Sequence, residues 1–130
     1  MTKRKNMRYG GVLLICNKTQ KFLLLKRNEV SSYPLTWSIV SGGVEKGEDY
    51  LDGVKRELWE ETKIESGEVD FELFEVDNSL VPNFHFYIGH CSKEFEVQLC
   101  DENINYGWFD INNLPKPLFP TLYSSLVRIF

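Results

Sequence analysis

Residues 42–64 read GGVEKGEDYLDGVKRELWEETKI, and this stretch decides the fold. Three of its first six residues are glycine, which lets the backbone bend sharply and approach a ligand closely. After the glycines, apolar residues recur at the spacing of one helical face: Leu51, Val54 and Leu58. The spacing predicts a helix over 49–62, with Asp49 or Glu48 capping its amino end.

The same helix carries a cluster of acidic side chains. Glu57, Glu60 and Glu61 stand at positions i, i+3 and i+4, so they share one stripe of the helix surface. At about 100° per residue this stripe lies beside the apolar one, which places it at the edge of a cleft. Like charges this close raise one another's proton affinity and favour a compensating cation. Taken alone, however, such a triplet is more typical of a solvated helix face.

The longer pattern reverses that preference. Eight positions have the spacing of the Nudix box, GX5EX7REUXEEXGU with U an aliphatic residue: Gly42, Glu48, Arg56, Glu57, Leu58, Glu60, Glu61 and Ile64. The chain therefore resembles the MutT-like members of the Nudix hydrolase family. One position departs from the pattern, because Lys63 stands where the family has glycine. A lysine in the left-handed conformation common at such helix ends costs roughly 1 kcal/mol or reshapes the turn.

The resemblance implies one α/β domain over residues 1–130, an α/β/α sandwich around a central mixed sheet. A chain of 130 residues suits a single compact domain. Outside the helix of 49–62, apolar runs predict a closing helix after Pro120 and short strands at 12–16, 22–25, 37–40, 69–76, 84–91, 95–99 and 106–109. The first two strands form a hairpin, and the third ends at the glycines of the box.

The family also implies a metal site. Hard oxygen ligands suit Mg²⁺, with Mn²⁺ as an alternative. The ligands implied are three carboxylates and, as a candidate addition, one backbone carbonyl: those of Glu57, Glu60, Glu61 and Ser41. Arg56 is implied to orient the carboxylates by charge-assisted hydrogen bonds, and Glu48 to brace the glycine loop against the helix.

Glu102 is the candidate general base. It lies six residues before Trp108, and MutT-like members have a functional glutamate at a similar distance before a tryptophan. Three alternatives stay open: an acidic surface loop, the neighbouring Asp101 as base, and Glu57 acting as the base itself.

Substrate contacts are predicted at two places. Lys26 and Arg27 end the second strand, where MutT-like members place an arginine that contacts phosphate. The alternative for both is a solvated strand end. Gly42 and Gly43 allow the backbone to approach a ligand. Phe84, Phe86 and Tyr87 are candidates for stacking on a base, although aromatic residues in strands more often fill a core.

The function implied is magnesium-dependent hydrolysis of a phosphoanhydride bond in a nucleoside diphosphate linked to another moiety. A (d)NTP pyrophosphohydrolase that releases a nucleoside monophosphate is the first hypothesis. ADP-ribose, a dinucleoside polyphosphate or a nucleotide sugar are alternative substrates. A hypothesis of another class is a Nudix module that senses a nucleotide without cleaving it, although such a module has no need of all three glutamates.

Composition narrows the partners and the compartment. The net charge of −4 does not favour a broad nucleic-acid-binding surface, which leaves a small nucleotide as the expected partner. Cys16, Cys91 and Cys100 form no CxxC pair and are odd in number, which indicates a reducing, cytoplasmic setting. No apolar run approaches the roughly 20 residues that span a bilayer, and the short one before Cys16 does not suit a lipoprotein signal. By family analogy we expect a monomer or homodimer.

Overall fold

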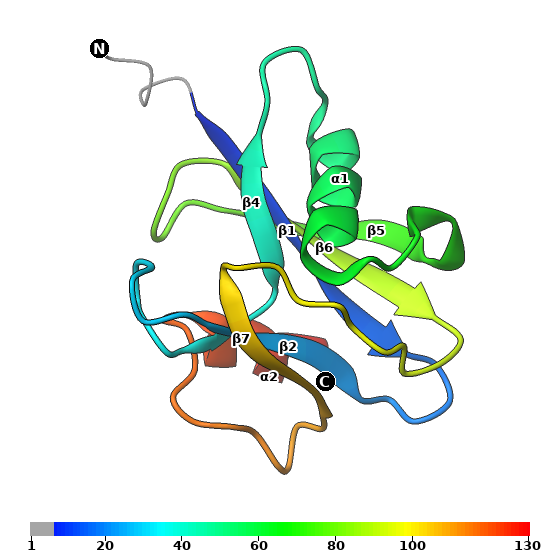
Figure 1. The fold of residues 1–130 in the computed structure, drawn as a ribbon. Helices are drawn as coiled ribbons and strands as arrows, with labels where there is room; N and C mark the ends of the chain where they lie inside the picture. The colour runs from blue at the N-terminus through cyan, green and yellow to red at the C-terminus, as the bar shows by residue number, and fades with distance from the viewer. Residues whose placement is uncertain (1–6) are drawn as a thin grey trace.

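The computed structural model describes residues 7–130, which form a seven-stranded mixed sheet with an α-helix against each face (Figure 1). The strands are β1 (Arg8–Cys16), β2 (Phe22–Arg27), β3 (Trp37–Ser38), β4 (Val40–Val44), β5 (Asp70–Asp77), β6 (Phe84–Cys91) and β7 (Asn103–Phe109). The helices are α1 (Tyr50–Thr62), the short 3-10 helix η2 (Ser66–Glu68) and α2 (Leu122–Ile129).

The strand order is β3-β2-β1-β6-β5, with β4 paired to β1 and β7 paired to β2. β1 and β6 are parallel, and the other pairs of these strands are antiparallel. Within residues 7–130, β4 pairs with β1 alone, so its other edge is open to side chains and ligands. No helix in this range combines the length and the hydrophobicity needed to cross a bilayer.

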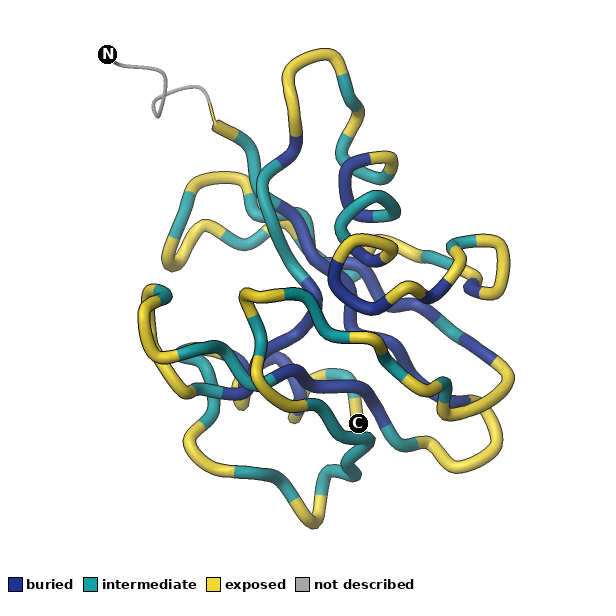
Figure 2. The backbone as a smooth tube through the Cα atoms, viewed as in Figure 1, coloured by how far each residue is buried: buried dark blue, intermediate teal, exposed yellow. Residues whose placement is uncertain are grey.

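The sheet separates two hydrophobic cores. Side chains alternate along β1, so Val12 and Leu14 pack beneath α1, whereas Leu13 and Ile15 pack beneath α2. Figure 2 shows this buried path through the central strands, with exposed residues concentrated in the connecting loops. A helical layer therefore covers each face of a mixed sheet, as the α/β/α sandwich requires.

α1 begins close to its predicted start. The Asp49 carboxylate accepts a hydrogen bond from the backbone N–H of Asp52 at 2.8 Å, so Asp49 is the capping residue. Glu48, the other residue predicted to cap this end, has its carboxylate bound to Arg56 and to the preceding loop instead.

The carboxyl end of α1 shows how the chain accommodates the departure from the Nudix pattern. Lys63 adopts a φ of 63°, the left-handed conformation, and its N–H donates to the Trp59 carbonyl at 2.9 Å. The lysine ammonium lies 5.1 Å from the centre of the Trp59 ring. The turn geometry is therefore kept although a glycine is absent.

The strand predicted over 37–40 is wrong in its extent. The chain forms two strands there, β3 and β4, and β4 continues through the glycines that were expected to end it. The reason is pairing with β1, in which Gly42 lies opposite Gly10 and Gly43 opposite Tyr9. The same pairing makes β1 begin at Arg8, four residues before the predicted start at Val12.

The strand predicted over 95–99 is also wrong, since this segment joins no ladder. Its alternation is real, because Phe95, Val97 and Leu99 pack against the core beneath α1. Two hydrogen bonds anchor the segment: the N–H of Gln98 donates to the Thr62 carbonyl at 3.1 Å, and the Trp108 indole Nε1 donates to the Phe95 carbonyl at 3.0 Å. Apolar alternation thus reflects a covering loop and not a strand.

Candidate active site

The three glutamates of α1 differ sharply in burial. The Glu61 residue is 4% exposed, and its Oε2 has no hydrogen-bond partner among residues 7–130. The Glu57 side chain is 14% exposed, and that of Glu60 is 51% exposed. The stripe therefore runs from solvent at Glu60 into the protein at Glu61.

Gly42 makes room for the acidic stripe. A Cβ built on Gly42 would overlap all three terminal atoms of the Glu57 carboxyl group. The glycine therefore lies directly against Glu57, and any larger residue at position 42 would require the Glu57 side chain to move. This is a closer role than the backbone flexibility for which the glycine was predicted.

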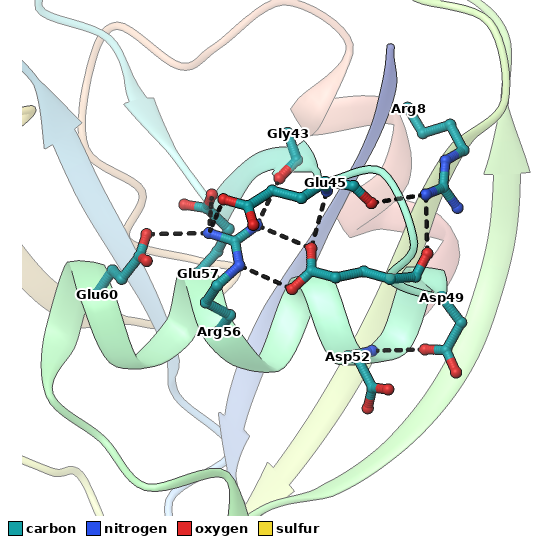
Figure 3. A network of polar contacts seen from close by, with 9 residues as sticks. Arg8, Gly43, Glu45, Asp49, Asp52, Arg56, Glu57 and Glu60 are labelled. Carbon is teal, nitrogen blue, oxygen red and sulfur yellow. Dashed lines mark hydrogen bonds and ion pairs between the residues drawn. The ribbon is translucent and has the colours of Figure 1, made fainter. Parts of the chain in front are cut away.

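Arg56 connects the acidic stripe to the loop before α1 (Figure 3). Its Nη1 donates to Glu57 and to Glu60, each at 3.1 Å, and its Nη2 donates to the Gly43 carbonyl at 2.9 Å. Nε and Nη2 also bind both oxygens of Glu48, at 2.9 and 3.1 Å. The arginine therefore connects the carboxylates of α1 with the loop before it.

These contacts shift the pKa of both partners. The hydrogen bond from Arg56 is the main reason that the pKa of Glu48 is lowered to about 2. The same bond raises the pKa of Arg56 well above its usual value. Both groups therefore stay charged at any physiological pH, and the brace persists.

Burial has the opposite effect at the inner end of the stripe. It raises the pKa of Glu61 to about 10, and the neighbouring Glu57 adds to this rise. Burial also raises the pKa of Glu57. Without a cation, Glu61 therefore keeps its proton at neutral pH. A divalent cation would replace that proton and satisfy the unpartnered Oε2 of Glu61, so these hard oxygen donors fit Mg²⁺ or Mn²⁺.

Across residues 7–130, no three His, Cys, Asp or Glu side chains gather as a formed metal-binding cluster. Glu60 is the reason, because its carboxylate is turned toward Arg56 and solvent. In any metal site on this stripe, Glu57 and Glu61 would form the inner part, and Glu60 would join them only by a change of rotamer.

A cavity of about 630 Å³ opens at the buried end of the stripe. Six residues predicted from the sequence line it: Arg27, Ser41, Gly42, Glu61, Phe86 and Glu102. Sequence reasoning did not assign site roles to three other aromatic residues of its wall: Tyr9, Tyr33 and Phe119. Tyr33 and Phe119 meet edge to face with ring centres 4.9 Å apart, but they come from loops without a periodic pattern, so no sequence signal paired them.

Arg27 and Lys26 have different surroundings. Arg27 donates to the carbonyl and hydroxyl of Ser32 at 2.8 and 2.9 Å, and its guanidinium lies over the Phe119 ring. Burial lowers the pKa of Arg27, opposed by the charges of Glu61 and Glu102. Lys26 lines neither cavity described here, and its Nζ lies 6.0 Å from the centre of the Trp37 ring. Of the two predicted cations, Arg27 alone faces the site.

Phe86 is 4% exposed and packs against Phe74 beneath α2. It is first a core residue, with an edge on the cavity. Three more predicted residues, Glu57, Arg56 and Gly43, line a second cavity of about 850 Å³, whereas Glu48, Glu60 and Lys26 line neither.

The sequence profile of the NUDIX domain matches residues 6–128. This chain belongs to the Nudix family. The match extends the likeness from the 23-residue box to nearly the whole sequence. It confirms the predicted family.

Two relatives of this Nudix chain illustrate how varied the similar proteins are. It is 40% identical over 63 residues to an RNA pyrophosphohydrolase of Pelagibacter ubique, a match that covers 48% of this chain and 39% of that one. The chain thus spans about two fifths of that relative's length. It is 25% identical over 125 residues to a dihydroneopterin triphosphate diphosphatase of Haemophilus influenzae, which covers 83% of this chain and 77% of that one.

Solved structures support the fold. A C. elegans Ap4A hydrolase has a TM-score of 0.76 at 21% identity, covering 94% of this chain and 95% of that chain. The Nudix hydrolase RenU from M. smegmatis has a TM-score of 0.82 at 16% identity, covering 94% and 82%. At these identities the likeness shows the fold, and it confirms the predicted α/β class with a mixed central sheet.

Proposed function

We propose that this Nudix chain hydrolyses a phosphoanhydride bond in a nucleoside diphosphate linked to another moiety, with Mg²⁺ as the cofactor and Mn²⁺ as a substitute. A (d)NTP that yields a nucleoside monophosphate is the first candidate substrate. The observation that carries the proposal is the unpartnered, buried Glu61 carboxylate beside Glu57, at the wall of a cavity of about 630 Å³. A buried acid without a partner is costly unless it serves a cation or a ligand.

Glu57, Glu61, the Ser41 carbonyl and a reoriented Glu60 would hold the metal. When bound, the metal would polarise phosphoryl oxygens and lower the pKa of a water molecule. In the reaction, the water oxygen forms a bond to phosphorus and the anhydride P–O bond breaks, with its electron pair leaving on the departing phosphate. The proton of the water passes to a carboxylate of the chain.

Glu102 is our candidate for that proton acceptor, because it lines the same cavity as Glu61 from the loop before β7. Its position is fixed by the backbone, since its carbonyl accepts a hydrogen bond from the N–H of Asn28 at 3.0 Å. Arg27 supplies a positive charge on this wall, which suits contact with a phosphate. Arg56 and Glu48 act through Glu57, by holding its carboxylate in place.

The relatives do not narrow the substrate to one compound. Those named above are called an RNA pyrophosphohydrolase, a dihydroneopterin triphosphate diphosphatase and an Ap4A hydrolase. ADP-ribose, dinucleoside polyphosphates and nucleotide sugars therefore remain alternative substrates. A sensing module without catalysis is the alternative of another class.

The test is a panel of nucleotides with Mg²⁺ or Mn²⁺, followed by release of phosphate or pyrophosphate. We expect Glu61→Gln to lower turnover at least about 100-fold, because the amide cannot replace the carboxylate as a metal ligand or anion. Glu65→Gln is the matched control, since Glu65 is exposed beyond the end of α1. Equal turnover by Glu61→Gln and wild type would refute the site, and metal binding without turnover of any substrate would favour the sensing module.

We also infer a cytoplasmic location and a monomer or homodimer. The unpaired cysteines, of which Cys16 and Cys91 are buried, support a reducing compartment, and the oligomeric state follows by analogy within the family. Sedimentation of the purified chain measures its oligomeric state.

A further inference from the structure

Glu102 lies in a tight turn at the entry to β7. Asp101 and Glu102 form the turn, and the N–H of Asn103 closes it on the Cys100 carbonyl at 3.3 Å. Both turn residues are exposed, so side-chain packing does little to fix them. The direction of the Glu102 carboxylate therefore depends on what holds the backbone of the turn.

The sheet gives the turn incomplete support. β7 lies beside β2 (Figure 1), but their pairing is irregular at this end. Lys26 lies opposite Asn105, whereas Arg27 lies opposite Asn103, so β7 has one extra residue, Ile104. Such a bulge disrupts the ladder locally and bends the strand. The ladder therefore ends in a distorted step next to the turn.

Asn28, the first residue after β2, supplies a further contact with the turn. Its backbone N–H donates to the Glu102 carbonyl at 3.0 Å, and its Nδ2 donates to the Asp101 carbonyl at 2.9 Å. Two successive carbonyls of the turn are thus bound by one residue. Because the second bond comes from the side chain, it depends on which amino acid stands at position 28.

The other half of Asn28 is bound to the loop that follows β2. Its Oδ1 accepts from the N–H of Val30 at 3.0 Å, and its carbonyl accepts from the hydroxyl of Ser31 at 3.0 Å. Asn28, Val30 and Ser31 line the cavity of about 630 Å³ together with Glu102. The amide donor therefore holds the turn while the amide acceptor is held by the loop. A side chain with only one of these functions cannot do both.

We propose that Asn28 is a positioning residue, which holds the turn of Asp101 and Glu102 so that the Glu102 carboxylate faces the cavity. The inference rests on the proposed function, in which Glu102 accepts the proton of the attacking water. Asn28 acts through Glu102 and not through the metal or the phosphate. Its loss lowers kcat more than it raises KM, because displacement of a reacting group by about 1 Å can cost about 100-fold in rate.

The experiment is steady-state kinetics of the full chain with Mg²⁺, on the nucleotide that wild type hydrolyses fastest. Asn28→Ala removes both side-chain bonds without a change of charge, whereas Asn28→Asp keeps the acceptor for Val30 and loses the donor for Asp101. We expect each to lower kcat about tenfold, with KM within about twofold of wild type. Gln20→Ala is the matched control, because Gln20 precedes β2 and its Nε2 donates to the Asn17 carbonyl at 3.0 Å. It should keep the wild-type kcat.

A second substitution separates positioning from a general loss of structure. Asn28→Ala should cost no further kcat in a chain that carries Glu102→Gln, because the proton acceptor is already absent there. Equal losses in the two backgrounds would show that Asn28 and Glu102 act independently, and would overturn the proposal. Full kcat in Asn28→Asp would also overturn it, since the bond to the loop would then suffice.

Amide hydrogen exchange tests the same contact without turnover. The N–H of Asn103, which closes the turn, should exchange about tenfold faster in Asn28→Ala and Asn28→Asp than in wild type or Gln20→Ala. Unchanged exchange at Asn103 overturns the positioning role, even in an enzyme that hydrolyses nucleotides. Faster exchange in a chain that hydrolyses no nucleotide, or whose Glu102→Gln variant keeps full turnover, supports the hold on the turn and contradicts the proposed function.

Discussion

At the scale of single residues, two adjacent glycines differ in what they allow. A Cβ on Gly42 would overlap the Glu57 carboxylate, whereas a Cβ on Gly43 would meet nothing nearer than 3.8 Å. We therefore expect Gly42→Ala to displace Glu57 and lower kcat by more than about tenfold, because small misplacements at a reacting centre are costly. Gly43→Ala should stay within about twofold of wild type, as surface substitutions without new contacts do. Steady-state kinetics on both variants decide this, and similar losses would contradict the steric argument.

The same pair shows what the residue pattern could and could not predict. The spacing placed Gly42 and Glu57 in one motif, but it gave the glycine a role in backbone bending. The contact between them depends on how β4 packs beside α1, which no local pattern records. From the sequence, Lys26 and Arg27 had the same predicted role for a similar reason. Only the folded structure distinguishes them, because Lys26 lies by the ring of Trp37 and Arg27 donates to the hydroxyl of Ser32.

At the scale of elements, α1 was the most predictable part of the chain, because its apolar period, cap and acidic stripe all agree. At the carboxyl end of α1, Lys63 lowers the stability of the protein, because its φ of 63° is unfavourable for a residue with a Cβ. We expect Lys63→Gly to raise the free energy of unfolding by about 0.5–1 kcal/mol, since relief of the backbone exceeds the lost contact with Trp59. Urea denaturation measures it, with turnover as the check that the site is unchanged. A lower free energy of unfolding would show that the ring contact dominates.

Elements with weaker local signals were predicted less well. β4 contains two glycines, which favour a turn in isolation, yet its pairing with β1 makes it a strand. The segment 95–99 has the alternation of a strand but lacks a neighbouring edge, so it covers the core as a loop. In both cases a long-range contact decided the structure.

At the scale of the whole molecule, buried acid groups connect stability to pH and to the metal. The pKa of Glu61 is raised from 4.5 to about 10, so the folded state holds its proton more tightly than the unfolded chain. Its contribution to stability is full below pH 4.5 and is lost as pH rises toward 10. Glu48 acts in the opposite window, because its pKa is lowered to about 2 and its contribution fades as pH falls from 4.5. Without metal, the contributions of Glu61 and Glu48 together make the protein more stable below pH 7 than above it.

We therefore expect the urea midpoint of metal-free protein to decrease as the pH is raised from 6 to 9. This window lies inside the range over which burial makes ionisation of Glu61 unfavourable. The slope should be much smaller in Glu61→Gln, which has no proton to lose, and in wild type with Mg²⁺, where the cation compensates the buried charge. Glu65→Gln, exposed and outside the site, should keep the wild-type slope. Equal slopes in wild type and Glu61→Gln would mean that another group controls the pH dependence. A slope that Mg²⁺ leaves unchanged would show that the cation does not compensate the charge of Glu61. The pH dependence of stability would then be independent of the proposed metal site.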